Sequence, residues 1–200
     1  MSTTWLRERA DGITRCWWCG DDPLYVAYHD DEWGRCVIDD RRLFEKLCLE
    51  GFQSGLSWLT ILRKRENFRA AFDDFDVEKI AGYDIGDVTR LLGDAGIVRH
   101  RGKIESTINN AQRAIELAET ESSIARYVER YVSDVPHRVD GELAIASTSP
   151  QSIAMSKDLK RRGWTFVGPT TMYAFMQAMG LVNDHLDGCW VRDRCGPVTS

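Results

Sequence analysis

The chain has 200 residues, of which 43% are hydrophobic and 28% charged, and its 16 Gly and 5 Pro exclude a collagen-like or low-complexity protein. The formal net charge of −5 excludes a globally basic nucleic-acid binder, so any contact with DNA must come from a local basic patch. No apolar run approaches the roughly 20 residues of a membrane span, and Met1–Ile13 lacks the apolar core of a signal peptide. We therefore expect a cytoplasmic protein with no membrane contact and with reduced cysteines.

Amphipathic helices are predicted for most of the sequence. Apolar residues recur at helical spacing in five segments before residue 135. These segments are 39–51, which Gly51 is expected to close, 57–68, 86–92, 104–115 and 124–131. Residues 135–146 lose the periodicity, and this loss predicts a linker.

The C-terminal part of the chain carries clear helix signals. Ser149 suits an N-cap, Pro150 suits the first helical position, and Gly163 follows a basic last turn, so a helix is predicted over 151–162. A last helix is predicted over 172–179. Because no alternating pair of strands is recognised, the predicted fold class is all-α.

Two Cys/His pairs lie near opposite ends of the chain. Cys16 and His29 are near the N-terminus, and His185 and Cys189 lie four residues apart near the other end. Two thiolates and two imidazoles suit a four-coordinate structural zinc that has no open position for water. Such a site would tie the two ends of the chain together.

Spacing alone leaves this ligand set open. Cys19 and Cys195 are rival ligands, and Cys16-Trp-Trp-Cys19 also has the spacing of a redox motif. Cysteines and histidines that bind nothing, in the core or at the surface, explain the pattern equally well. On the residues alone, a zinc site and unligated side chains are equally supported.

Aromatic residues are concentrated ahead of the first predicted helix. Five of them lie between residues 17 and 33: Trp17, Trp18, Tyr25, Tyr28 and Trp33. Farther on, Glu50 falls at the C-terminal end of a helix, where the macrodipole disfavours a carboxylate, and Trp58 begins the next helix. Aromatic faces with one carboxylate and one phenol can hold a base turned out of DNA and read its edge. Ordinary core packing is the alternative for each aromatic taken singly.

A turn between the third and fourth predicted helices is basic. Gly96 can end one helix, and Gly102 permits a close backbone approach at the start of the next, where an anion is favoured. The basic side chains around it are Arg99, His100, Arg101 and Lys103. A helix-hairpin-helix element of this kind would hold DNA phosphates without reading sequence, and Lys103 is expected to contact one of them. A solvated interhelical turn is the alternative.

Several of these motifs occur together in one known family. The stretches CWW, DPLYVAYHDDEWG, LEGFQSGLSW, GIVRHRGKI, RRGWTFVGPTT, FMQA, GLVNDH and HLDGC follow one another from about residue 15 to residue 189. In this order they resemble the bacterial 3-methyladenine DNA glycosylase I family of the helix-hairpin-helix superfamily. The resemblance implies an all-α enzyme that excises 3-methyladenine from alkylated double-stranded DNA, without cutting the strand, and leaves an abasic site. We expect it to act as a monomer in the bacterial cytoplasm, at the nucleoid.

The resemblance also implies roles for individual residues. Glu50, as the catalytic group, and Tyr28 would hydrogen-bond the extruded base, and Trp58 would stack on it. The positions that line or support this pocket are Trp18, Tyr25 and Trp33. The ligands of a structural zinc would be Cys16, His29, His185 and Cys189.

Further positions are expected to touch DNA. Gln53 and Leu56 match positions that would fill the gap left in the DNA stack, although a family member carries polar Gln where this chain has Phe52. Together with the hairpin, the predicted DNA contacts are Gln53, Leu56, Arg99, Arg101, Gly102 and Lys103.

The chain is predicted to form one glycosylase domain over 15–190 with two helical lobes. The middle lobe is roughly 40–135 and contains the hairpin, while the terminal zinc lobe combines 15–39 with 136–190. Residues 1–14 are assigned as an N-terminal extension and 191–200 as a C-terminal tail.

Two other functions fit parts of the pattern. A non-catalytic DNA-binding module could recognise damage through the same hairpin and pocket, and it would release no free base. A zinc hydrolase unrelated to DNA could use Asp30, Asp31 or Glu32 beside His29 as its acid or base, and its zinc would need an open position.

Overall fold

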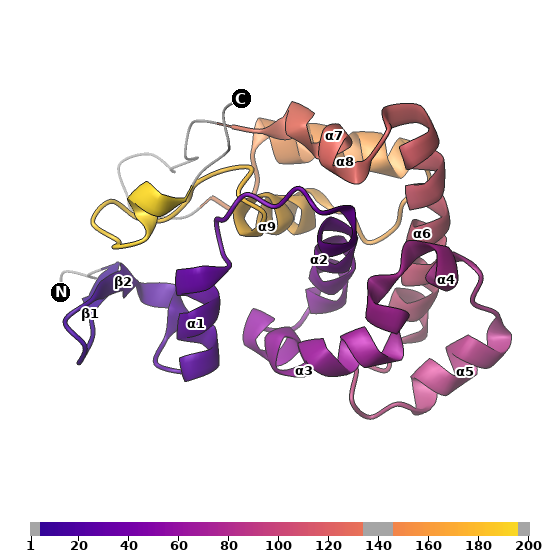
Figure 1. The fold of residues 1–200 in the computed structure, drawn as a ribbon, viewed down its shortest axis with the longest axis horizontal. Helices are drawn as coiled ribbons and strands as arrows, with labels where there is room; N and C mark the ends of the chain where they lie inside the picture. The colour runs from indigo at the N-terminus through magenta and orange to yellow at the C-terminus, as the bar shows by residue number, and fades with distance from the viewer. Residues whose placement is uncertain (1–4, 134–145, 196–200) are drawn as a thin grey trace.

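The computed structural model describes residues 5–133 and 146–195, and these residues form a mostly helical protein (Figure 1). The helices are α1 (Pro23–Asp31), α2 (Asp40–Gln53), α3 (Trp58–Ala71), α4 (Val77–Ala81), α5 (Ile85–Gly93), α6 (Arg101–Glu121), α7 (Ile124–Val128), α8 (Pro150–Arg161) and α9 (Pro169–Ala178). Short 3-10 turns cover Trp17–Cys19, Asp73–Phe75, Glu129–Tyr131 and Arg192–Arg194. Strands β1 (Leu6–Glu8) and β2 (Thr14–Cys16) pair antiparallel.

Helix α2 is central to the packing, because it contacts α3, α6, α7 and α9. Asp39 caps its N-terminus by accepting a hydrogen bond from the backbone N–H of Arg42 at 2.9 Å. Gly51 does not close the helix, contrary to the sequence expectation. A Cβ at this position would make a tight contact of 3.3 Å with Cβ of Phe166, so Gly51 suits the close packing there, and the helix continues to Gln53.

The other predicted helices are present, with shifted ends. Helix α8 begins as expected, because Ser149 and Ser152 form a capping box and Pro150 occupies the first position. Helix α6 extends beyond the predicted 104–115 in both directions. The predicted linker lies outside the described residues except for Ala146.

Three elements were not predicted: α1, α4 and the β1/β2 pair. Asp22 starts α1 by accepting hydrogen bonds from the backbone N–H groups of Leu24 and Tyr25, with Pro23 at the first position. The two strands have three residues each, too few for alternation to be recognised. The all-α prediction is therefore corrected to a mostly helical fold with one small hairpin.

The two ends of the described chain lie together. Leu6 of β1 pairs with Cys16 of β2, and the backbone N–H of Trp190 donates to Thr14 O at 3.1 Å. A small apolar cluster that contains Cys16, Leu186 and Cys189 joins strands β1 and β2 to the segment after α9. In Figure 1 this segment, in yellow, lies beside β1, β2 and α1.

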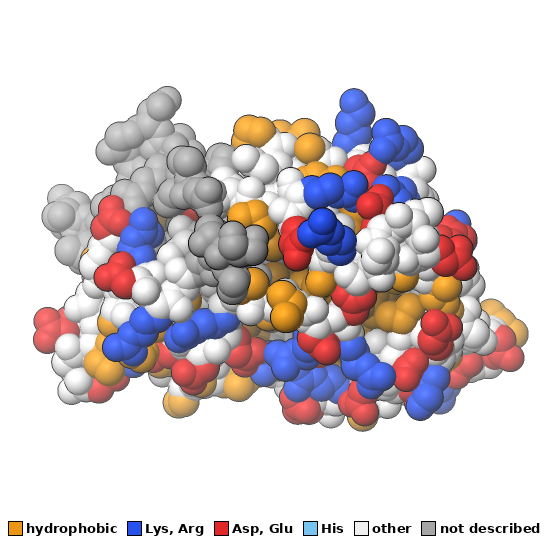
Figure 2. Space-filling model, turned by 45° about the horizontal axis from the view of Figure 1, so that its top comes forward, with side chains coloured by type: hydrophobic (Ala, Val, Ile, Leu, Met, Phe, Trp, Pro, Cys, Tyr) orange, Lys and Arg blue, Asp and Glu red, His pale blue; other side chains and the backbone are white. Residues whose placement is uncertain are grey.

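The surface has mixed charge. Figure 2 shows Lys and Arg interspersed with Asp and Glu on the face that it displays. Among the helices of the described ranges, none is both long and apolar enough to span a bilayer.

Candidate metal centre and active-site cavity

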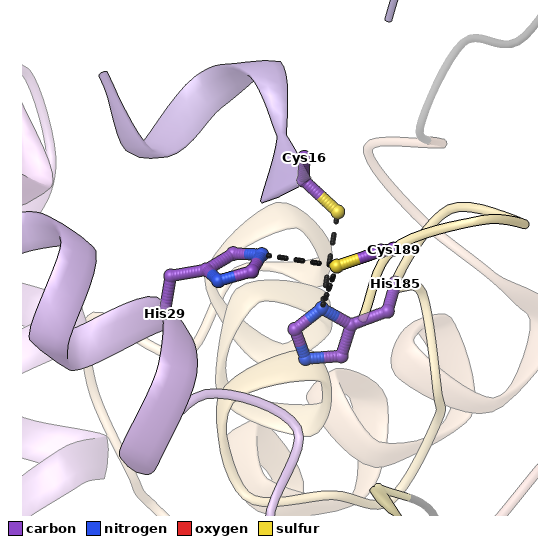
Figure 3. Close-up of side chains that lie close together, drawn as sticks. All are labelled: Cys16, His29, His185 and Cys189. Atoms are coloured by element: carbon purple, nitrogen blue, oxygen red, sulfur yellow. Dashed lines mark hydrogen bonds between the residues drawn. The ribbon is translucent and has the colours of Figure 1, made fainter. Parts of the chain in front are cut away.

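Four predicted ligands converge on one point: Cys16, His29, His185 and Cys189 (Figure 3). All four are buried, and their ligand atoms lie within 4.8 Å of one another. They come from the end of β2, from α1 and from the segment after α9, so the cluster joins parts of the chain more than 150 residues apart.

The hydrogen bonds of the two histidines fix which ring nitrogen faces the cluster. His29 Nδ1 lies 2.8 Å from Asp30 Oδ1, and His185 Nε2 lies 3.0 Å from the Trp33 carbonyl oxygen. Since both partners are acceptors, each of these nitrogens carries the hydrogen, and the other nitrogen presents a lone pair. Those nitrogens, His29 Nε2 and His185 Nδ1, lie 3.5 and 3.6 Å from Cys189 Sγ. Two imidazole lone pairs and two cysteine sulfurs are thus turned toward one point and could hold a metal ion.

Outer residues hold the carboxylate that orients His29. Arg15 donates to Asp30 at 2.8 to 3.0 Å, and Trp190 Nε1 donates to it at 3.0 Å. A carboxylate of this kind behind a ligating imidazole fixes its tautomer and orientation. Arg15 and Trp190 were not predicted from the sequence, and Asp30 was predicted only as an acid or base.

The rival cysteines lie outside the cluster. The Cys19 thiol donates to the backbone oxygen of Cys16 at 3.2 Å, and burial is the largest influence that raises the pKa of Cys19. Cys195 Sγ lies 3.8 Å from the backbone oxygen of Trp33. Neither residue belongs to the group of four that could hold a metal ion.

A cavity of about 190 Å³ lies beside this cluster and gathers the side chains predicted to bind a base. We call it the aromatic cavity. Its lining includes Trp18, Tyr25, Tyr28, Trp33, Glu50, Gln53 and Trp58. Ala174 and Gln177 of α9 complete the wall. Gln177 falls within a motif of the resemblance, but neither residue was assigned to the site from the sequence.

Ring contacts connect the aromatic cavity to the Cys/His cluster. The ring centroids of Trp18 and His29 are 5.1 Å apart, and those of Trp33 and His185 are 4.6 Å apart, both edge to face. Trp18 and Trp33 contact each other at 4.8 Å. The cluster therefore supports one wall of the cavity.

Glu50 lies on α2, lines the aromatic cavity and is paired with a buried lysine. Lys46 Nζ lies 2.9 Å from Glu50 Oε1 and donates to the Tyr28 hydroxyl at 2.8 Å. Burial lowers the pKa of Lys46, and the Glu50 charge opposes this shift. Burial also raises the pKa of Tyr28 well above its ordinary value, so the phenol is neutral. Lys46 was not predicted from the sequence to belong to the site.

The predicted DNA contacts fall in two places. Gln53 lines the aromatic cavity, and Leu56, on the loop between α2 and α3, is 41% exposed. Arg99 and Arg101 are exposed at the start of α6, where Arg101 pairs with Glu105 at 3.2 Å. Gly102 follows in the first turn of α6.

Lys103 is placed differently from the expectation that it contacts a phosphate. Its ammonium donates to the backbone oxygens of Phe52 and Ser54 at 2.8 and 2.6 Å, and the residue is buried. The basic character of the segment suggested an exposed side chain, but the partners lie about 50 residues earlier in the chain. Lys103 thus fastens the end of α2 and the loop that carries Leu56.

Comparison with solved structures places the chain among DNA glycosylases. A crystal structure of 3-methyladenine DNA glycosylase I superposes with a TM-score of 0.82 at 47% identity, covering 92% of this chain and all of that one. The corresponding enzyme from Staphylococcus aureus, described with the structural basis of its 3-methyladenine recognition, gives a TM-score of 0.81 at 36% identity. This match covers 90% of this chain and 95% of the other.

Sequence comparison identifies the family. The methyladenine glycosylase family model matches residues 18–193, and the chain belongs to this family. The DNA-3-methyladenine glycosylase 1 of Escherichia coli K12 is 49% identical over 179 residues, which cover 88% of this chain and 96% of the relative.

Proposed function

We propose that this protein is a base-excision repair glycosylase that hydrolyses the N-glycosidic bond of 3-methyladenine in alkylated double-stranded DNA. The names of its relatives and the reported 3-methyladenine recognition by the Staphylococcus aureus enzyme support this activity. The observation that carries it in this chain is the aromatic cavity, where Tyr28, Glu50 and Trp58 meet.

Stacking and hydrogen bonding would hold the extruded base in this cavity. Trp58 and Tyr28, with ring centroids 5.3 Å apart, offer aromatic faces, and Glu50 offers an acceptor for the exocyclic amine. While still attached to deoxyribose, a purine methylated at N3 carries a positive charge. Attraction of such a cation to an aromatic face contributes about 0.5–2 kcal/mol, which intact adenine does not gain.

Once the base is bound, cleavage of the N-glycosidic bond needs only a modest lowering of the barrier by the protein. A cationic purine is a good leaving group, so less of the barrier must be removed by placed charges than for a neutral base. Glu50 would act by binding the charged base rather than by carrying a proton. Water would then complete a monofunctional reaction that leaves an abasic site.

The remaining assignments belong to the same proposal. Zinc, held by the four Cys/His ligands, would supply a structural link between the chain ends. The turn before α6 would serve as the hairpin of a helix-hairpin-helix element, with Arg99, Arg101 and the backbone near Gly102 on phosphates. Gln53 and Leu56 would fill the gap in the DNA stack. We propose a monomer with the two lobes described above, acting on the bacterial nucleoid.

The activity is tested by incubating the protein with methylated duplex DNA and identifying the released bases by chromatography. We expect free 3-methyladenine, an abasic site, no strand cleavage and no borohydride-trapped adduct. Metal analysis of the same sample should find one zinc per chain. DNA binding without base release would instead identify a damage-binding module.

A further inference from the structure

Lys46 contacts three residues of the proposed base site at once. Besides the Glu50 and Tyr28 contacts given above, its Nζ lies 3.2 Å from the ring centroid of Trp58. The side chain is only 6% exposed. A buried ion pair is often replaceable by apolar side chains without loss of stability, so Lys46 is not explained by folding alone.

Lys46 lies behind the aromatic cavity rather than in its lining. A second cavity of about 120 Å³ is lined by Lys46 and Glu45, whereas Glu50 lines the aromatic cavity and not this one. Tyr28 and Trp58 line both cavities and so form the wall between them. Lys46 can therefore fix the wall residues without occupying the space for a base.

The Lys46 contact determines how the Tyr28 hydroxyl can bond. An ammonium group only donates hydrogen bonds, so the Tyr28 oxygen must accept from Lys46. Within residues 5–133 and 146–195, the Tyr28 hydroxyl donates no hydrogen bond of its own, and its hydrogen is available to a ligand. The buried indole N–H of Trp58 likewise has no partner among these residues.

We propose that Lys46 is a positioning residue that sets the hydrogen-bonding pattern of the cavity, with Tyr28 as donor and Glu50 as acceptor, and thereby favours adenine over guanine. This inference rests on the proposed glycosylase function. The edge of adenine that carries N6 and N7 offers a donor beside an acceptor, which matches the pattern. The same edge of guanine offers two acceptors, O6 and N7, and would set O6 against the Glu50 carboxylate.

The Lys46–Glu50 ion pair also limits how far charge can distinguish one methylated purine from another. The positive charge of Lys46, which lies behind the cavity wall, partly offsets that of Glu50, so the attraction of a charged base to Glu50 is weaker than for an unpaired carboxylate. Selectivity between two cationic methylated purines must then come from the arrangement of donors and acceptors, because both carry the same charge. Lys46 fixes that arrangement.

The test compares excision of 3-methyladenine and 3-methylguanine from methylated DNA, as the ratio of their kcat/KM values, in wild type and Lys46→Met. Methionine is similar in length but cannot donate a hydrogen bond. We expect the ratio to fall about tenfold through loss of 3-methyladenine excision, the size of one hydrogen bond. Lys46→Arg retains donors and should keep most of the ratio.

Glu45→Gln is the matched control, because Glu45 is buried on the same helix and lines the second cavity but bonds to Arg69 at 2.9 Å instead of the base site. Its ratio should equal that of wild type. An unchanged ratio in folded Lys46→Met overturns the proposal, as does an equal fall in Glu45→Gln.

Tyr28→Phe tests the same claim without altering Lys46. It removes the hydroxyl donor, so the ratio must fall here too, and an unaltered ratio in this variant overturns the proposal even where Lys46→Met does not fold. Wild-type protein that releases neither base would refute the proposed glycosylase function instead. Wild-type release of 3-methyladenine with unaltered variant ratios would refute only the role of Lys46.

Discussion

The Cys/His cluster and the aromatic cavity are adjacent, but their polar groups are arranged in opposite ways. In the cluster, each imidazole N–H donates a hydrogen bond to an acceptor outside the cluster. The other two ring nitrogens and the two sulfurs lie close together and could bind a metal ion. Among the residues that line the cavity, Trp18 and Trp58 have buried indole N–H groups without partners among the described residues. The first arrangement suits a permanent ligand with a closed shell, and the second suits one that enters and leaves.

The largest effect is expected from breaking the cluster. Cys189→Ser should lose the metal and lower the free energy of unfolding by about 3 kcal/mol or more, a fall of roughly 6–12 °C in Tm. Because Trp18 and Trp33 pack on the two histidines, excision should fall as well. Metal analysis and thermal unfolding provide the readouts.

Cys19→Ser is the matched control for the cluster, since Cys19 is also buried but lies outside the group of four. It should keep a full complement of metal. If Cys189→Ser retained the metal, or if Cys19→Ser lost it, the ligand assignment would be wrong.

The next largest effect is expected in the cavity itself. Glu50→Gln keeps the size of the side chain but removes the charge, and excision of 3-methyladenine should fall about 100-fold or more. Metal content and DNA affinity should remain, while Tm should fall because Lys46 is left buried without its partner charge. This outcome would separate the two regions, because only one function is lost. Full excision by the variant would remove the assignment of Glu50.

A smaller change is expected from the carboxylate behind His29. Asp30→Asn weakens the orientation of the ring without removing a ligand, and zinc affinity should fall about 10–100-fold. Competition with a chelator measures this affinity. A variant that held zinc as tightly as wild type would show that Asp30 does not support the site.

Elements whose start and end signals lie within a few neighbouring residues could be predicted from the sequence. Elements that depend on contacts with distant residues could not. Helix α8 has its cap, its proline and its stop within a few residues, so it was predicted well. Helix α1 packs aromatic residues toward more than one neighbour and shows no single apolar stripe, so it was missed although Asp22-Pro23 marks its start.

The site residues show the same division. His185 and Cys189 form a local pair, but their partners across the chain were assigned only through the family resemblance. Lys46 stands four residues before Glu50, the spacing of neighbours on one helix face, and this signal could have found the ion pair. Lys103 could not have been placed, because its acceptors are backbone oxygens of a distant loop.

The smallest expected effects separate the two kinds of basic residue near the hairpin. Arg101→Ala removes an exposed charge and should reduce the slope of log affinity for DNA against log salt by about 1. Lys103→Met should leave that slope unaltered but lower excision, because it frees the loop that carries Leu56. Binding titrations at several salt concentrations distinguish the two variants. A slope that changed only in Lys103→Met would show that Lys103, and not Arg101, contacts a phosphate.

The claim that the aromatic cavity selects an alkylated adenine is tested most directly by the binding of free bases, which carry no fixed positive charge and so report shape and hydrogen bonding alone. Tryptophan fluorescence can follow titration of wild type and Glu50→Gln with 3-methyladenine and with adenine, since Trp18, Trp33 and Trp58 line the cavity. We predict that wild type binds 3-methyladenine about fourfold more tightly than adenine, the contribution of one buried methyl group, and that Glu50→Gln binds 3-methyladenine about tenfold more weakly than wild type. Equal binding of the two bases by wild type, or undiminished binding of 3-methyladenine by the variant, would contradict the account.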